Sequence, residues 1–162
     1  MALTTTIAFS LIAKLTAAGD LGTPTVDISY NKSLALATGV AANQADMVWP
    51  DQRTLAASAN EDIDLAGALT SLLGGTLTFV RIKYLWIFAA IANTNNVQVR
   101  RPATNGVPFI TAVSAGMDLK PGGMMFWADP SAGGVGVTAG TGDLINIANS
   151  GAGTSVTYDI IV

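Results

Sequence analysis

Hydrophobic and polar residues alternate with the period of a β-strand in many short segments of the chain. Near the C-terminus, the even-numbered residues from Val156 to Val162 are apolar, whereas Thr157 and Asp159 between them are polar. Successive side chains of a strand point to opposite faces of its sheet. This segment is therefore predicted to bury one face and expose the other.

The longest such segment covers residues 76–88 and is rich in β-branched and aromatic side chains. Its even-numbered positions are apolar from Val80 onward, and its odd-numbered positions carry Arg81 and Lys83 before the apolar Leu85. The pattern predicts a strand that is solvated on one face at its start and buried on both faces at its end.

Shorter strand candidates fill the rest of the chain, and from Gly75 onward clusters of Gly, Asn and Pro separate them at roughly 8–12 residues. The candidates are residues 7–15, 25–30, 34–38, 47–57, 62–65, 97–101, 123–128, 135–138 and 144–148. The only helix-like stretch, residues 66–73, is short enough to be a single-turn connection instead. The pattern predicts one all-β domain over residues 1–162, an antiparallel β-sandwich with little helix. Its predicted core contains Val80, Ile82, Tyr84, Trp86, Phe88, Leu144, Ile147, Val156, Tyr158 and Ile160.

The first fifty residues alternate less clearly and are rich in Ala, Thr and Ser. Residues 1–23 begin with a strand-like pattern at a chain end, where one side has no fixed neighbour. Two interpretations stay open: an N-terminal arm that adds a strand to another subunit's sheet, or an edge strand within its own domain.

Composition bounds the class of protein. A length of 162 residues suits one domain. Half of the residues are hydrophobic and 12% are charged, against roughly 25% charged in typical soluble domains. So few charges leave apolar surface that copies of the chain or a partner must cover, so we expect a homo-oligomer. The net charge is −3 and the basic residues are scattered, which argues against nucleic-acid binding.

The chain contains no cysteine and no histidine, which excludes disulfides, thiolate metal sites and imidazole bases. A serine nucleophile would have to recruit a lysine such as Lys14, Lys32 or Lys120 as its base. A pair of glycosidase carboxylates would need a substrate cleft that a chain of this size has little room for. We therefore expect no enzyme, no catalytic residue and no cofactor.

The N-terminus lacks the basic segment of a signal peptide, and the longest apolar run, residues 84–92, is about half of a membrane span. We expect a protein made in the cytoplasm without an export signal and with no membrane partner.

Four motifs have a possible binding role. Asp62 and Asp64 share a strand face and could hold calcium, although a solvated strand edge is the simpler interpretation. The glycines at 133–136 and 140–142 are better explained as turns than as a phosphate loop, because no helix pattern follows them. The segment Trp49-Pro50-Asp51-Gln52-Arg53 would suit a glycan platform if its Trp were exposed.

The fourth motif is a group of methionine and aromatic side chains close to the C-terminal third of the chain. Its members are Met117, Met124, Met125, Phe126 and Trp127. Core is the default interpretation, but consecutive apolar residues on an edge strand cannot all be buried. Part of this group is predicted to form an interface.

Five segments in the second half of the chain carry a family resemblance. They are RTLAASA at 53–59, DIDLAG at 62–67, NTNN at 93–96, KPGG at 120–123 and the glycine-punctuated closing segment 138–162. From about Met47 to its end, the chain resembles small virion proteins of tailed bacteriophages, and within that class the capsid decoration (cement) proteins. The resemblance implies a jelly-roll β-sandwich on the capsid surface of the virion, a homotrimer, and the major capsid protein as partner. It carries over no site residues.

Two other functions stay open from the sequence. A fibre or tail-tip module that binds a receptor or glycan would expose several aromatics together on one face. A tail-tube or neck component would form closed rings instead of trimers.

Overall fold

The computed structural model describes residues 2–67 and 69–162 of the chain. In this part of the chain 52% of the residues lie in β-strands and none lies in a helix, which confirms the predicted all-β class. No helix of the length and hydropathy that a membrane crossing requires occurs in these two ranges.

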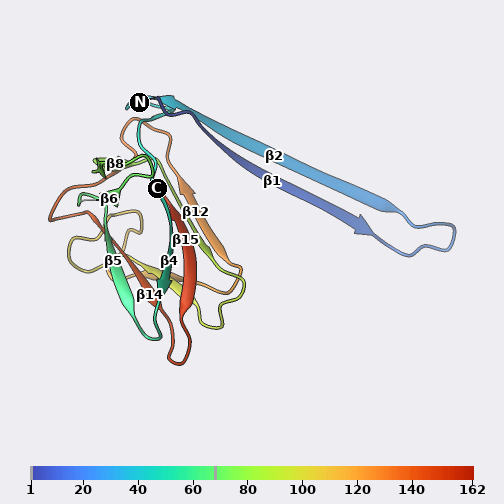
Figure 1. The fold of residues 1–162 in the computed structure, drawn as a ribbon. Helices are drawn as coiled ribbons and strands as arrows, with labels where there is room; N and C mark the ends of the chain where they lie inside the picture. The colour runs from blue at the N-terminus through green and yellow to red at the C-terminus, as the bar shows by residue number, and fades with distance from the viewer. Residues whose placement is uncertain (1, 68) are drawn as a thin grey trace.

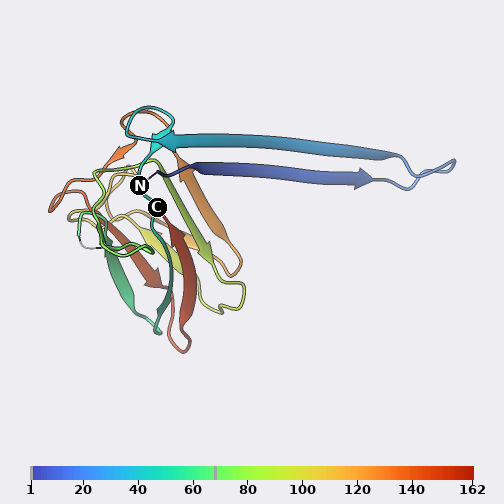
Figure 2. The same ribbon diagram turned by 45° about the horizontal axis from the view of Figure 1, so that its top comes forward.

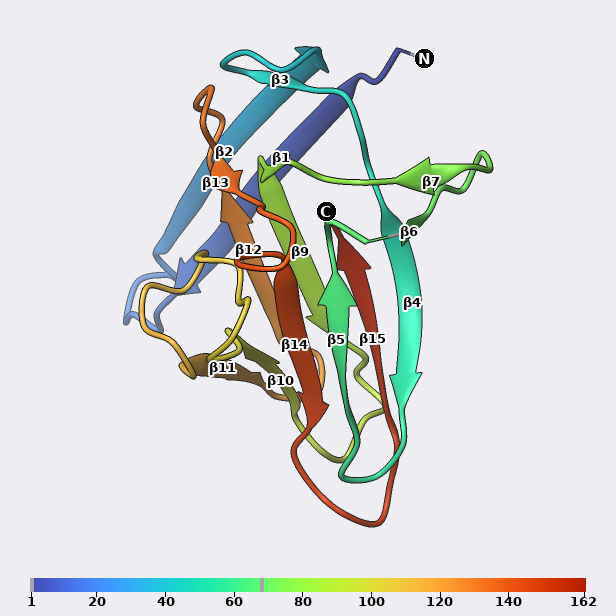
Figure 3. The ribbon, with the colours of Figure 1, turned by 90° about the vertical axis from the view of Figure 1, so that its left-hand side faces the viewer.

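Eight strands form a sandwich of two four-stranded antiparallel sheets, in the orders β11-β10-β14-β5 and β12-β9-β15-β4 (Figure 3). Their bounds are β4 Pro50–Leu55, β5 Asn60–Asp64, β9 Tyr84–Ala89, β10 Val97–Arg100, β11 Gly116–Leu119, β12 Met124–Ala128, β14 Leu144–Asn149 and β15 Val156–Ile161. The first of these strands pairs with the last, the second with the seventh, the third with the sixth and the fourth with the fifth. This nested pairing is the arrangement of a jelly roll, as predicted.

The inward faces of the two sheets make the core. Val156, Tyr158 and Ile160 of β15 are fully buried, as their alternation predicts, and they face Ile145 and Ile147 of β14 across the sandwich. Of the remaining predicted core residues, Ile82 and Tyr84 are buried, whereas Trp86, Phe88 and Leu144 are half-buried.

The prediction for residues 76–88 is wrong in two respects. The segment is not one strand but three short ones, β7 Thr76–Leu77, β8 Arg81–Ile82 and β9. Val80 is 59% exposed instead of buried, and Lys83, predicted on a solvated face, is only 7% exposed. The breaks between the strands reset the alternation, so the buried face changes from Ile82 to the odd-numbered residues of β9.

The remaining elements are short connections. Residues 66–73 contain β6 Leu69–Thr70, which pairs with β7, and no helix in the described part of the stretch. Ala68 within it, and Met1 at the start of the chain, lie outside the described residues. β13 Val135–Gly136 pairs with β8. β11 was not predicted, because Gly116 and Asp118 interrupt its apolar pattern.

The N-terminal region forms a long two-stranded hairpin of β1 Thr5–Thr16 and β2 Thr25–Thr38. The segments 25–30 and 34–38, predicted as separate strands, are parts of the single strand β2. The hairpin leaves the same end of the sandwich at which the C-terminus lies and extends far beyond the body of the molecule (Figures 1 and 2). β3 Gln44–Ala45 pairs with the end of β2 and leads into β4. We call residues 5–38 the arm.

Candidate functional site

The arm is amphipathic, and the register of its two strands is the reason. Thr5 pairs with Leu36 and Thr16 pairs with Thr25, with every pair between them in register. Residues directly opposite each other share a face of the hairpin. One face, which we call the apolar arm face, therefore collects Ile7, Phe9, Leu11, Ala13, Leu15, Val26, Ile28, Tyr30, Lys32, Leu34 and Leu36. The other face carries mostly Ser, Thr, Asn and small side chains, with Lys14 and Asp27 paired across the strands.

Most of the apolar arm face is exposed. Beyond the root, its large apolar side chains have exposed fractions from 44% for Ile28 to 62% for Leu15, with Phe9 at 56%. Phe9 lies edge-on to Tyr30, with ring centroids 6.4 Å apart, and the Lys32 ammonium lies 5.5 Å from the Tyr30 ring centroid. A two-stranded hairpin alone is marginally stable in water, and this one carries a row of unpartnered large apolar side chains. The arm is thus built to contact something outside its own sandwich.

A small apolar cluster holds the root of the arm. Leu36, 1% exposed, packs with Ala45 and Tyr84. Half-buried apolar side chains surround these residues: Leu3, Ile7, Leu34, Val48, Ala128 and Ile161. This cluster is separate from the sandwich core. The root of the arm is therefore attached to the sandwich by this apolar cluster and not by the sandwich core.

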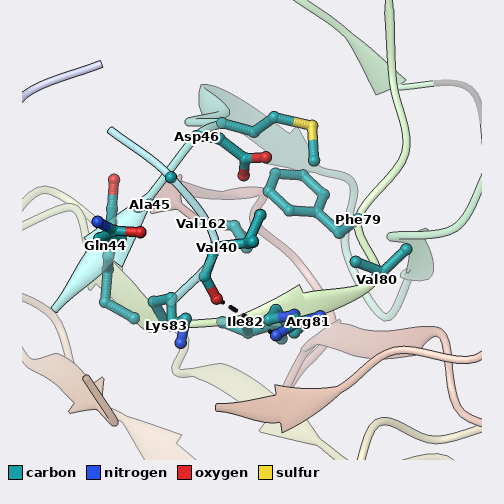
Figure 4. A pocket seen from close by; sticks show the side chains of 13 residues that line it. Val40, Gln44, Ala45, Asp46, Phe79, Val80, Arg81, Ile82, Lys83 and Val162 are labelled. Carbon is teal, nitrogen blue, oxygen red and sulfur yellow. Dashed lines mark hydrogen bonds between the residues drawn. The ribbon is translucent and has the colours of Figure 1, made fainter. Parts of the chain in front are cut away.

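Two basic side chains fasten the connection that follows the arm (Figure 4). Arg81 donates from Nη1 to the carbonyl oxygens of Ala132 at 2.7 Å and Val40 at 3.4 Å. Lys83 donates from Nζ to the carbonyl oxygens of Ser131 and Ala41. Burial, with the charge of Arg81 nearby, lowers the pKa of Lys83. The two basic residues that alternation placed on a solvated face thus tie the loop after the arm to the loop after β12.

The cavity beside these contacts is small. Its volume is about 40 Å³, and Val40, Gln44, Phe79 and Ile82 are among the residues that line it (Figure 4). Such a space holds a few water molecules at most. It suits packing around the root of the arm and offers no room for a substrate.

The outer face of the β12-β9-β15-β4 sheet is apolar on the side nearest the arm. Met124 and Phe126 of β12 are 59% and 49% exposed, and Trp86 and Phe88 of β9 beside them are half-buried. We call these four residues the apolar sheet face. Their register confirms that they share one face, because Met124 pairs with Phe88 and Phe126 with Trp86.

An open groove of about 680 Å³ lies where the arm leaves the sheet. Ile7 and Phe9 line it from the arm, and Trp86, Met124 and Phe126 line it from the sheet. The two apolar faces therefore meet at the root and diverge outward. Each is left uncovered by the chain itself.

The predicted methionine and aromatic group divides by strand alternation. Met125 is buried and Trp127 packs against the core, whereas Met124 and Phe126 point outward. Met117 lies apart from them on β11 and is 49% exposed. Two members of the group thus belong to the core and three to the surface, which agrees with the argument that an edge strand cannot bury all of them.

The glycan platform predicted around Trp49 is contradicted. Trp49 is only 5% exposed and belongs to the sandwich core, and its backbone pairs with Val162 in both directions. The indole ring is therefore not available to stack on a sugar. The condition that Trp49 be exposed is therefore not met, and Pro50 opens the edge strand β4.

The two carboxylates proposed for calcium have protein partners. Asp62 accepts a hydrogen bond from Asn146 Nδ2 at 2.7 Å, and Asp64 accepts one from the Ala66 amide at 3.0 Å. No group of three acidic, cysteine or histidine side chains that would suit a metal occurs in residues 2–67 and 69–162. The geometry favours the solvated strand edge.

The glycine segments proposed as turns form turns. Gly134 and Gly140 adopt left-handed φ angles of 55° and 73°, and the Gly140 amide donates to Asp143 Oδ2 at 2.6 Å. β13 occupies the end of the first segment, β14 follows the second, and neither segment leads into a helix.

Sequence reasoning missed one half-buried polar cluster. Arg53 Nε donates to Glu61 Oε2 at 2.8 Å, and its Nη1 lies 3.0 Å from Asp51 Oδ2. The Tyr158 hydroxyl donates to Glu61 Oε1 at 2.7 Å, and burial together with the Glu61 charge raises the pKa of Tyr158. The cluster joins β4, β5 and β15, and it borders neither of the two described cavities. We therefore interpret this cluster as a stabilising contact between the two sheets.

No protein family, curated protein sequence or solved structure matches this chain.

Proposed function

We propose that this chain is a structural virion protein that binds an assembled capsid and stabilises it, in the manner of a decoration protein. The observation that carries the proposal is the arm, a projecting hairpin with a row of exposed apolar side chains and no partner within its own sandwich. Such a surface suits a protein that works by assembly. The major capsid protein is the proposed partner, and a homotrimer is the proposed form.

Two further features support the proposal. Jelly rolls are common among viral shell proteins, although they also occur in lectins, so the fold permits the role without requiring it. The charged fraction of 12% leaves apolar surface that an isolated subunit would have to expose. A protein that binds the assembled shell and not its free subunits stabilises the shell by mass action.

The receptor- or glycan-binding alternative is the weaker one. Phe9, Tyr30 and Phe126 are exposed aromatics, but Trp49 is buried. The groove beside Trp86 and Phe126 is lined mainly by apolar side chains and offers few polar groups to bind a sugar. A tail-tube or neck component remains a second alternative, and it would form closed rings of the chain without the capsid.

The test compares shells with and without the purified full-length protein. Capsids saturated with the protein are expected to retain their contents to a temperature several degrees higher than bare capsids. Equal heat resistance of saturated and bare capsids would contradict the proposal, and binding to a glycan array instead would favour the receptor-binding alternative.

A further inference from the structure

We infer that the partner of the apolar arm face is a second copy of this chain, whose apolar sheet face it covers. Each chain carries two uncovered apolar surfaces, one along the arm and one over Trp86, Phe88, Met124 and Phe126. A single kind of contact, arm to neighbouring sheet, covers both surfaces at once. A contact between two arms would leave the sheet face bare.

The charges on the two surfaces are complementary. Among the paired residues of the apolar arm face, all described, Lys32 is the one charged side chain. On the outer face of the β12-β9-β15-β4 strands, also fully described, Asp159 is the one charged side chain, beside Phe88 in the register. A lone cation in one apolar surface and a lone anion in the other fix the orientation in which the surfaces meet.

The area is large enough for a specific contact. Phe9, Leu11, Leu15, Val26, Ile28 and Tyr30 are each 44–62% exposed. With about 200 Å² for a large apolar side chain, they offer roughly 600 Å² per arm. The neighbour's sheet face adds roughly 350 Å², because Met124 and Phe126 are 59% and 49% exposed and Trp86 and Phe88 are half-buried. Each contact then buries about 1,000 Å² in total, which is the threshold for a specific interface.

The arm cannot close onto its own sheet instead. The β1–β2 pairs run without a break from the root, where Leu36 is buried against Tyr84, to the distal pair Thr16 and Thr25. Folding the arm back would break backbone hydrogen bonds of this ladder or pull Leu36 out of its cluster. The arm therefore reaches outward to a neighbour, and copies linked this way form either an exchanged pair or a closed ring.

This inference gives the apolar arm face, which carries the capsid proposal, to a neighbouring copy, so the capsid would then contact another surface of the assembly. The cross-linking test addresses the contact between copies and the heat-resistance test addresses capsid binding, so the two proposals can fail separately. Because the chain has no cysteine, single cysteines can report the contact. We would co-express an affinity-tagged Leu11→Cys chain with an untagged Phe126→Cys chain, oxidise mildly and separate the products on a non-reducing gel. The expected main product is the mixed disulfide between the two chains. Ile12→Cys is the matched control, because Ile12 is 80% exposed on the opposite face of the arm; it should cross-link to Phe126→Cys at least about tenfold less.

Other outcomes would overturn the inference. A dominant Leu11–Leu11 cross-link would mean that arms cover each other, and an internal disulfide in a chain carrying both cysteines would mean that the arm folds onto its own sheet. A mass of 16.5 kDa by light scattering at micromolar concentration would also refute it. In light scattering, Leu11→Glu and Phe126→Glu should each release monomers, whereas Ile12→Glu should not. Lys32→Glu should weaken association about tenfold, and adding Asp159→Lys should restore it.

Discussion

The cluster at the root of the arm predicts that Leu36→Ala detaches the arm and leaves the sandwich folded. Leu36 is 1% exposed, and it packs against Tyr84 in a cluster that is separate from the sandwich core. Removing three carbon atoms forfeits about 2.4 kcal/mol of burial at 0.8 kcal/mol each. The cavity that remains raises the cost to about 3 kcal/mol, which is roughly a 150-fold change in the ratio of docked to undocked arm.

Hydrogen exchange read out by mass spectrometry measures this effect segment by segment. In dilute solution, where copies are separate, root amides of β1 and β2 should exchange about 100-fold faster in the variant. Amides of β14 and β15 should exchange at the rate of the parent protein. Two controls frame the result: Ile12→Ala, on the exposed polar face, should change neither region, and Ile147→Ala, in the sandwich core, should accelerate both.

One result would refute the reasoning. If Leu36→Ala accelerated exchange in β14 and β15 as much as in the arm, root and sandwich would unfold as one cooperative unit. The arm would then be part of the core instead of a separately attached element.

Two further predictions concern the polar contacts that brace the sandwich. Tyr158→Phe removes the hydroxyl that donates to Glu61 and should lower the free energy of unfolding in urea by about 1–2 kcal/mol, whereas Tyr30→Phe on the exposed arm should leave it unchanged. Because burial lowers the pKa of Lys83, the unfolded chain binds more protons than the folded chain between that lowered value and about pH 10.4. The contribution of Lys83 to the free energy of unfolding therefore rises with pH through that window. Between about pH 8 and pH 10, the free energy of unfolding should rise less steeply with pH in Lys83→Met than in the parent protein. Equal slopes in the two proteins would contradict this assignment.

Local alternation in the sequence determined the class of the fold and the faces of its regular strands. In β15 the burial of Val156, Tyr158 and Ile160 followed from the period of the apolar residues alone. In β12 the period put Met124 and Phe126 on one face and Met125 and Trp127 on the other, but it did not say which face is buried. The turn glycines likewise marked where strands end, because left-handed φ angles are a local requirement.

Only the tertiary structure decided what lies against each face. Alternation cannot tell that residues 76–88 break into three strands, that Lys83 turns inward to bind two carbonyl groups, or that Trp49 is covered by the end of the chain. These outcomes depend on segments more than forty positions away along the chain, such as residues 131 and 162.

The arm shows the same division. Its sequence contained the apolar side chains of β1 and β2, but only the pairing of Thr5 with Leu36 and Thr16 with Thr25 places them on one face. Only the position of the root on the sandwich leaves that face without cover. Burial is a property of the surroundings, and a strand's own period specifies its faces but not its neighbours.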